Sequence, residues 1–331
     1  MKEYGGYLPL EINDGKDFFL SNEFQSRKYN SGRAAIFMAI EDLSVKRCWV
    51  PNYLCEYVKI FLASMGIEVI LYNISEKFEP LNINYKKGDA VLFTNYFGLI
   101  PDKYIAYLTE QYEYLILDNT QAFYRAPVLK KGVYNVYSCR KFFGVNDGAY
   151  LISKYFFNNE RWLETSHSEN SFSFLVESFE KGTNAAYELS LENERRIDTE
   201  GVRKMSNLTN AIMRTVDYAD VEKKRKNNFE VLNSHLFDIN ELSWLIGKRK
   251  EACMVYPFLV KNEKLRSFLI KNKIYVPQWW KYVLDMDISN EFECFLSKYL
   301  FALPIDQRYS AEDMDFISSI ILGFLDDKSS K

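Results

Sequence analysis

Two residues with complementary chemistry each follow a strand-like run of apolar residues. Asp118 comes directly after the run 115–117, and Lys141 comes shortly after the run 134–137. A lysine amine can hold the aldehyde of a cofactor as a Schiff base, and a carboxylate can keep a pyridine nitrogen protonated so that the ring accepts electrons. An acid after one strand and a lysine after the next therefore predict a pyridoxal phosphate (PLP) site with Lys141 and Asp118 as its catalytic residues.

The composition excludes several classes of protein. The chain has 331 residues, 47% of them apolar, which is enough for a sizeable core. Its formal net charge of -3 leaves no basic excess to neutralise phosphates, so we expect no nucleic-acid partner. No run approaches the roughly 18 apolar residues that a membrane span needs, and the N-terminus lacks the apolar core of a signal peptide. We therefore expect no membrane partner, and the five scattered cysteines fit a reducing cytoplasm.

Other common kinds of site lack their sequence signals. The two histidines, His167 and His235, lie in polar surroundings without a nearby cysteine or a paired carboxylate pattern. The sequence therefore predicts neither a metal site nor a Ser-His-Asp triad. No GxGxxG or GxxxxGK[ST] motif is present, which argues against dinucleotide and P-loop sites.

Helical and strand-like patterns alternate between residues 30 and 150. Helices are predicted over 33–40, 57–65 and 104–111, and strands over 47–50, 67–72, 90–94, 114–117, 134–137 and 149–152. This alternation predicts an α/β fold with a mostly parallel, doubly wound sheet and helices on both faces. Ligands of such sheets bind beyond the carboxyl ends of the strands.

The pattern changes after about residue 155. Helices are predicted over 159–180, 206–235, 263–272 and 311–325, and strands over 253–260 and 274–276. The sequence therefore predicts a large PLP-binding α/β domain over residues 1–195. A smaller C-terminal α+β domain is predicted over residues 196–331.

The motifs resemble those of the DegT/StrS sugar aminotransferases, which belong to the aspartate aminotransferase (fold type I) superfamily of PLP enzymes. The resemblance covers most of residues 28–325. In that family a turn of small residues begins a helix whose backbone amides hold the cofactor phosphate. The turn here is Ser31-Gly32-Arg33-Ala34-Ala35, so the resemblance implies that Gly32, Arg33 and Ala34 bind the phosphate. A helix N-terminus suits this role because it offers free N–H groups and a positive dipole end.

Further cofactor contacts follow from the same resemblance. Asp118 and Gln121 match the family's Asp-x-x-Gln/His, in which the Asp bonds the pyridine nitrogen and the Gln bonds the phenolate oxygen. Ser138 matches the phosphate-binding serine, and Lys141 matches the Schiff-base lysine by its spacing to Asp147. The segment from the serine to the lysine is two residues shorter than in the family.

The residue that stacks on the pyridine ring departs from the family pattern. The family's aromatic residue aligns with Cys55. Tyr53 or Tyr57 could supply the ring instead, and we favour Tyr53.

Two motifs of the C-terminal half also bear on the site. The family's Asn-Tyr-Arg-Met-Ser survives only as Met205-Ser206, so the asparagine that reaches the neighbouring subunit's phosphate has no counterpart. Leu303-Pro304 resembles a late motif of the family, and Arg308 after it is the candidate partner of an anionic substrate group.

The resemblance implies a cytoplasmic, homodimeric, PLP-dependent aminotransferase. It would move an amino group from an amino acid donor, glutamate being favoured, to a nucleotide-linked keto sugar in cell-surface polysaccharide or amino-sugar biosynthesis. Two alternatives stay open. A sugar dehydratase of this family carries histidine in place of the lysine, so Lys141 argues against it. A non-catalytic binding protein that kept the fold is suggested by Cys55 and by the missing asparagine.

Overall fold

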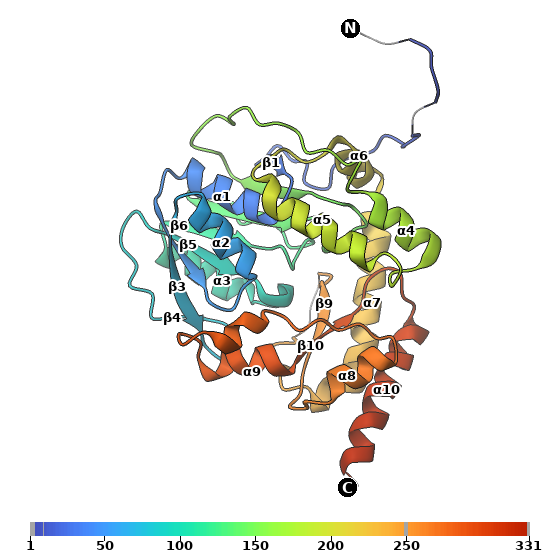
Figure 1. Cartoon of the computed structure of the whole chain (residues 1–331). Coiled ribbons are helices and arrows are strands. Elements are labelled where there is room, and N and C mark those ends of the chain that lie inside the picture. The colour runs from blue at the N-terminus through green and yellow to red at the C-terminus, as the bar shows by residue number, and fades with distance from the viewer. Residues whose placement is uncertain (1–3, 9, 248–250, 330–331) are drawn as a thin grey trace.

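The N-terminal part of the chain is built on one large sheet (Figure 1). The structure is a computed structural model that describes residues 4–8, 10–247 and 251–329. The sheet has eight strands in the order β1-β8-β7-β6-β5-β2-β3-β4. The strands are β1 (Gln25–Tyr29), β2 (Arg47–Pro51), β3 (Glu68–Ile74), β4 (Pro80–Leu81), β5 (Ala90–Thr94), β6 (Tyr114–Asp118), β7 (Val133–Ser138) and β8 (Ala149–Ser153).

Strands β3, β2, β5, β6 and β7 run parallel to one another, and β1, β8 and β4 join the sheet through antiparallel pairs. The predicted mostly parallel sheet is therefore confirmed. Strand β1 was not predicted, because its sequence Gln-Ser-Arg-Lys-Tyr is largely polar and does not read as a buried strand.

Helices cover both faces of the sheet, as predicted. The N-terminal part contains α1 (Gly32–Asp42), α2 (Glu56–Ser64), α3 (Asp102–Gln111), α4 (Ser173–Lys181), α5 (Tyr187–Glu200), α6 (Asn207–Thr215) and the 3-10 helix η1 (Tyr96–Gly98). Helices α1 and α2 pack with one set of strand residues, and α3 packs with the alternate set. We call the first side the α1 face of the sheet. Residues 159–172, which were predicted to be helical, form no helix in the structure.

The C-terminal part is a smaller arrangement of helices around a two-stranded sheet. It contains α7 (Tyr218–Leu236), β9 (Val255–Leu259), α8 (Leu265–Lys271), α9 (Glu291–Tyr299), β10 (Leu300–Pro304), α10 (Ala311–Ser329) and the 3-10 helices η2 (Phe237–Ile239) and η3 (Lys281–Asp285). The predicted strand 274–276 is absent: Ile274 and Val276 are buried in the core, but they join no sheet. The predicted helix 206–235 is divided into α6 and α7.

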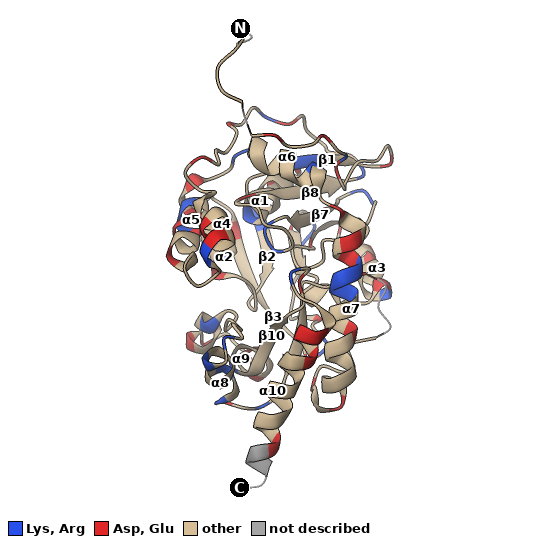
Figure 2. Ribbon diagram, turned by 90° about the vertical axis from the view of Figure 1, so that its right-hand side faces the viewer, with Lys and Arg blue, Asp and Glu red and all other residues tan. Residues whose placement is uncertain are grey.

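Positively and negatively charged residues are mixed along α7 (Figure 2). Lys224 pairs with Asp220 and Lys226 with Glu222, each one helical turn away. Lys224 and Lys226 therefore have their own counter-charges on the outer side of the helix, whereas Arg225 of the same basic run is buried.

The segment before α7 still packs on the large sheet. Lys204 forms isolated bridges with Tyr29 and Thr165. Ser206 donates its backbone N–H and its hydroxyl to the buried carboxylate of Asp147, each at 2.8 Å. The division of the chain after residue 195 stays a prediction, and these contacts favour a boundary at the turn between α6 and α7.

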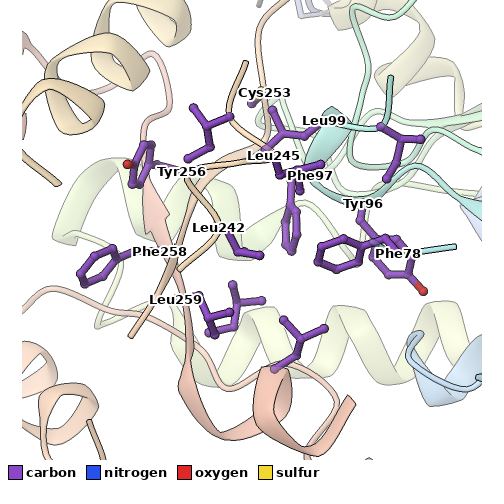
Figure 3. Close-up of a cluster of buried hydrophobic side chains, with 14 of the residues drawn as sticks. Phe78, Tyr96, Phe97, Leu99, Leu242, Leu245, Cys253, Tyr256, Phe258 and Leu259 are labelled. Carbon is purple, nitrogen blue, oxygen red and sulfur yellow. The ribbon is translucent and has the colours of Figure 1, made fainter. Parts of the chain in front are cut away.

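One continuous apolar core joins the two parts (Figure 3). Phe78, Tyr96 and Phe97 from the N-terminal part meet side chains of the C-terminal part in this cluster. The ring of Phe97 stacks on that of Trp279 with centres 5.8 Å apart. The position of the C-terminal part relative to the strand ends is therefore fixed by packing.

The buried carboxylate of Glu293 adds a polar link between the parts. It accepts hydrogen bonds from Asn52 Nδ2 (3.0 Å), Asn73 Nδ2 (2.7 Å) and the backbone N–H of Ile74 (3.0 Å). It also accepts the backbone N–H of Asn290 at 3.2 Å, as part of the capping box that begins α9. These bonds offset the cost of burying the charge, and they hold α9 against the ends of β2 and β3.

Candidate active site

Three polar side chains gather at the carboxyl ends of neighbouring strands, on the α1 face. Thr94 and Asp118 are paired residues of β5 and β6. Leu92 and Ile116, two positions earlier on these strands, pack with α1. Side chains alternate between the two faces of a strand, so Thr94 and Asp118 lie on the α1 face as well. Ser138 lies two positions after Val136 on β7, and Val136 also packs with α1, so Ser138 is on this face too. This is the sheet edge where a ligand of a doubly wound fold is expected.

The start of α1 lies against the same strand ends. Ser31 caps the helix, and its hydroxyl accepts the N–H of Ala34 at 3.2 Å. A Cβ atom on Gly32 would lie 3.1 Å from Cγ2 of Thr120. Glycine therefore allows the helix start, with its free N–H groups, to approach the residue that follows Asp118-Asn119.

Lys141 points its amine at this group of residues. Its side chain is exposed, and Nζ donates to Thr120 Oγ1 at 2.9 Å. Thr120 in turn donates its backbone N–H to Asp118 Oδ1 at 3.0 Å. The structure therefore brings Gly32, Thr120, Asp118 and Lys141 together, as the spacing of the motifs predicted for the lysine and the acid.

Helix α5 supplies acids to the two arginines of the site. Arg33 at the start of α1 forms an ion pair with Asp198, and Arg140 binds Glu194 through two nitrogens. Burial raises the pKa of Glu194, but the hydrogen bond and the charge of Arg140 lower it by more. The pKa of Glu194 therefore lies below the ordinary value of a glutamate. The site therefore has arginines whose charges are balanced by α5, which lies beside α1 (Figure 1).

A buried polar network fixes the turn after Lys141. Asp147 is fully buried and accepts hydrogen bonds from Ser206 and Thr209. Burial raises the pKa of Asp147 above its ordinary value, and these hydrogen bonds oppose the rise. Gly148 follows with a φ of 111°, and a Cβ atom there would lie 2.9 Å from Cγ2 of Thr209. The Asp-Gly pair is therefore a packing requirement of this turn.

Two residues predicted to bind the cofactor have other partners in the structure. Gln121 accepts the backbone N–H of Phe97 through Oε1 at 2.9 Å. Tyr53 is fully buried, with its ring 4.4 Å from that of Trp280 and 6.1 Å from that of Tyr96. The structure therefore does not bring Tyr53 to the group around Lys141.

Tyr57, the other candidate for the stacking ring, lies near the start of α1. Its side chain is half exposed, and the guanidinium carbon of Arg33 lies 5.8 Å from the centre of its ring. Cys55 directly precedes α2 in the same segment, and its side chain makes no capping hydrogen bond. Of the two tyrosines, Tyr57 is the better placed.

Thr94 and Thr120 were not among the predicted site residues. The signal for Thr120 was its position inside Asp118-Asn119-Thr120-Gln121, where a hydroxyl follows the acid. Thr94 ends the apolar run of β5, and from the sequence alone it reads as part of that strand. Only the pairing of β5 with β6 places it beside Asp118.

The residues present fit PLP. Asp118 uses one oxygen for Thr120, and its second oxygen accepts no hydrogen bond from the described residues. Beside it, the buried hydroxyl of Thr94 has no hydrogen-bond partner within the described part of the chain. Buried polar atoms ordinarily have partners, so a polar ligand at this edge would supply the partner that the Thr94 hydroxyl lacks. Gly32 and the exposed amine of Lys141 both lie against Thr120, at this same edge of the sheet.

The described residues contain neither a candidate metal site nor a helix that could span a membrane. Nowhere in the ranges 4–8, 10–247 and 251–329 do three His, Cys, Asp or Glu side chains gather as metal ligands would. Each helix in those ranges is too short or too polar to cross a membrane.

Known proteins resemble the chain in structure and not in sequence. No protein-family model matches it, and no curated protein matches it. The aminotransferase TlmJ from Streptoalloteichus hindustanus has 14% identity over 92% of this chain and 86% of that chain, with a TM-score of 0.64. The sugar aminotransferase CalS13 from Micromonospora echinospora has 12% identity over 89% and 86%, with a TM-score of 0.62.

A DegT DnrJ EryC1 StrS aminotransferase from Brucella abortus has 14% identity over 91% of this chain and 86% of that chain, with a TM-score of 0.59. The fold expected from the motifs is thereby confirmed. The chain has the fold of the DegT/DnrJ/EryC1/StrS aminotransferases.

Proposed function

We propose that this chain is a PLP-dependent aminotransferase. Its amino donor would be an amino acid, glutamate being favoured, and its acceptor a nucleotide-linked keto sugar in cell-surface polysaccharide or amino-sugar biosynthesis. One observation carries the proposal: Lys141 Nζ lies 2.9 Å from Thr120 Oγ1, between the end of β6 and the start of α1. TlmJ and CalS13, which share the fold, are an aminotransferase and a sugar aminotransferase, and this supports the reaction class.

The site residues divide the work of holding the cofactor and moving protons. PLP supplies an aldehyde that captures amines and a ring that withdraws electrons. Lys141 would hold the aldehyde end and then accept and return the substrate proton at Nζ. Asp118 would keep the pyridine nitrogen protonated. The phosphate would be held by Ser138 and by the backbone N–H groups of Gly32, Arg33 and Ala34, and the phenolate oxygen by Gln121.

Two of these assignments are sharpened by the hydrogen bonds of the site. The N–H of Ala34 is bonded to Ser31, so the N–H groups of Gly32 and Arg33 are the freer donors. Gln121 uses its carbonyl oxygen for Phe97, which leaves its amide nitrogen as the donor that a phenolate oxygen needs.

The proposal is tested by adding PLP to the purified protein and recording the visible absorbance spectrum. We expect a visible band from the lysine-bound cofactor that shifts when glutamate is added. A band that does not respond to glutamate or to other amino acids supports another PLP reaction. A protein without any band is a non-catalytic binder, and the proposal then fails.

The ring that stacks on the cofactor is proposed to be Tyr57. An aromatic contact of this kind contributes about 0.5–1.5 kcal/mol beyond area burial, so Tyr57→Leu should weaken PLP binding by up to about tenfold. The control is Tyr53→Phe, which removes a buried hydroxyl that has no partner among the described residues and should leave the PLP affinity unchanged. Titrations of both variants with PLP measure the effect, and an unchanged PLP affinity in Tyr57→Leu contradicts the stacking role of Tyr57.

Arg308 is proposed to meet an anionic group of the sugar substrate. Its guanidinium is exposed and already binds Asp306 through two bonds of 2.7 Å and 2.9 Å. An exposed charge contact contributes at most about 1 kcal/mol, so Arg308→Ala should raise the KM for the sugar no more than about fivefold and leave the PLP affinity alone. Loss of PLP on dialysis, with sugar binding intact, contradicts this role.

A homodimer is proposed on the basis of unpartnered apolar side chains. None of the residues of α4 is buried, and its Phe179 is 89% exposed. Trp162 and Tyr187 nearby in sequence are also exposed. A surface of this kind marks an interface. Light scattering at micromolar concentration should give twice the 39.0 kDa mass of the chain, and Phe179→Asp should lower it. A wild-type protein of single-chain mass rules the dimer out.

We also propose a cytoplasmic location. Four of the cysteines, Cys48, Cys55, Cys139 and Cys294, are free thiols, which suits a reducing compartment. Fractionation of cells checks this, and recovery of the protein outside the cytoplasm argues against it.

A further inference from the structure

Two side chains from the C-terminal part hold the backbone next to Lys141. The carbonyl oxygen of Phe142 accepts a hydrogen bond from Arg225 Nη2 of α7 at 3.1 Å. It accepts a second from Gln307 Nε2, in the segment after β10, at 2.9 Å. The guanidinium carbon of Arg225 also lies 4.6 Å from the centre of the Phe142 ring. Both donors therefore act on the residue that directly follows the candidate Schiff-base lysine.

The two donors are locked to each other and to a third segment. Arg225 Nε donates to Gln307 Oε1 at 3.0 Å. Its Nη1 donates to the carbonyl oxygens of Cys253 at 3.3 Å and Met254 at 3.1 Å. The Arg225 side chain is 2% exposed, and burial lowers its pKa to about 10, so it stays charged at neutral pH. A planar guanidinium with several of its donors engaged has little freedom to move.

The lysine is consequently fixed at its backbone and accessible at its amine. The N–H groups of Phe142 and Phe143 close a turn on the carbonyl oxygen of Cys139, at 3.0 Å and 2.9 Å. The side chain of Lys141 is exposed and reaches Thr120 Oγ1. A rigid turn that carries a reachable amine is the arrangement that a covalent site requires, because a misplacement of about 1 Å can cost two orders of magnitude in rate.

We infer that Arg225 and Gln307 are positioning residues for Lys141. By holding the Phe142 carbonyl, they fix the direction from which the amine approaches Thr120 and the aldehyde of the cofactor. This inference rests on the proposed function. It gives the C-terminal part a role at the cofactor, in addition to the substrate contacts expected of it.

The test uses the full-length protein and a matched pair of variants. Gln307→Leu removes both the bond to Phe142 and the acceptor of Arg225 at nearly constant volume. The control is Asn228→Leu. Asn228 is buried one turn along α7 and donates to the carbonyl oxygens of Ile305, Asp306 and Tyr309, so it ties the same segments together without touching Phe142. The second variant is Arg225→Lys, which keeps the positive charge and loses the planar set of guanidinium donors.

Two measurements are made on each protein. Without PLP, hydrogen exchange of amides 140–146 should be about tenfold faster in Gln307→Leu and unchanged in Asn228→Leu, because the turn loses its anchor only in the first. With PLP, the rate constant for borohydride trapping at Lys141 should fall about tenfold in Gln307→Leu and stay near the wild-type value in the control. Arg225→Lys should change both quantities in the same direction.

The outcomes distinguish this inference from the proposed function. If the wild-type protein does not trap PLP at Lys141, the proposed function fails, whereas hydrogen exchange still shows whether Gln307 holds the turn. If the wild type traps PLP and Gln307→Leu behaves like Asn228→Leu in both measurements, the positioning role is wrong. If Gln307→Leu does not fold, Arg225→Lys decides the question. Wild-type rates of hydrogen exchange at amides 140–146 and of PLP trapping at Lys141 in that variant would overturn the inference.

Discussion

Lys141→Ala is expected to remove the visible absorbance of the bound cofactor and to lower transamination by about a thousandfold or more. The side chain would supply both the covalent link to PLP and the group that moves the substrate proton, so both functions are lost together. Folding should be unaffected within about 0.5 kcal/mol, because the Lys141 side chain is exposed and has one hydrogen bond, to Thr120. Absorbance spectra, steady-state rates and a thermal melt measure the three effects.

Two other lysines provide matched controls for this variant. Lys131 and Lys154 are exposed, as Lys141 is. Lys131 precedes β7 and Lys154 follows the antiparallel β8, so both lie at the opposite edge of the sheet. Lys131→Ala and Lys154→Ala should retain the spectrum and the rate. Borohydride reduction followed by peptide mapping should label Lys141, and a label on either control lysine shows that the assignment is wrong.

Asp118→Asn is expected to leave PLP bound and to lower turnover by about two orders of magnitude or more. The variant removes a positioned negative charge beside the ring, and such a loss costs several kcal/mol of transition-state stabilisation. The amide oxygen of the substituted side chain can still accept the N–H of Thr120, so the local fold should persist. Single-turnover rates with glutamate measure the effect.

Asp89→Asn is the control for the loss of a buried carboxylate. Asp89 is 5% exposed and accepts the Trp49 indole N–H at 2.9 Å, but it precedes β5 and so lies at the far edge of the sheet. Its substitution should affect stability and leave the rate per folded molecule unchanged. Near-normal single-turnover rates in Asp118→Asn would sink the role assigned to that residue.

The sheet was predictable where burial and turn chemistry agree. The strand regions of β5 and β6 are apolar runs bounded by turn residues, and both were located correctly. Strand β1 escaped because its polar residues are stabilised by pairing with β8, more than a hundred residues later. Residues 274–276 have the apolar pattern of a strand, yet Ile274 and Val276 are buried in the core without joining a sheet.

The candidate site was predictable where its residues are neighbours in sequence. The spacing within the segments 118–121 and 138–147 is local, and the structure places Asp118 and Lys141 at one site. The choice between Tyr53 and Tyr57 depends on which side of the chain each ring points to. Trp280, which is distant in sequence, packs on the Tyr53 ring and keeps it in the core. No pattern around residue 53 carries that information.

The apolar cluster shared by the two parts limits how the molecule could be re-engineered. Substrate preference is commonly sought by exchanging a whole C-terminal segment with that of a relative. Here the donor segment would have to present the same surface to Phe78 and Phe97 as Phe292 and Trp279 now do. A mismatch of even one methylene in such a core is felt as a cavity or as strain. Chimaeras of this chain should therefore be designed by grafting loops onto its own core and not by joining halves.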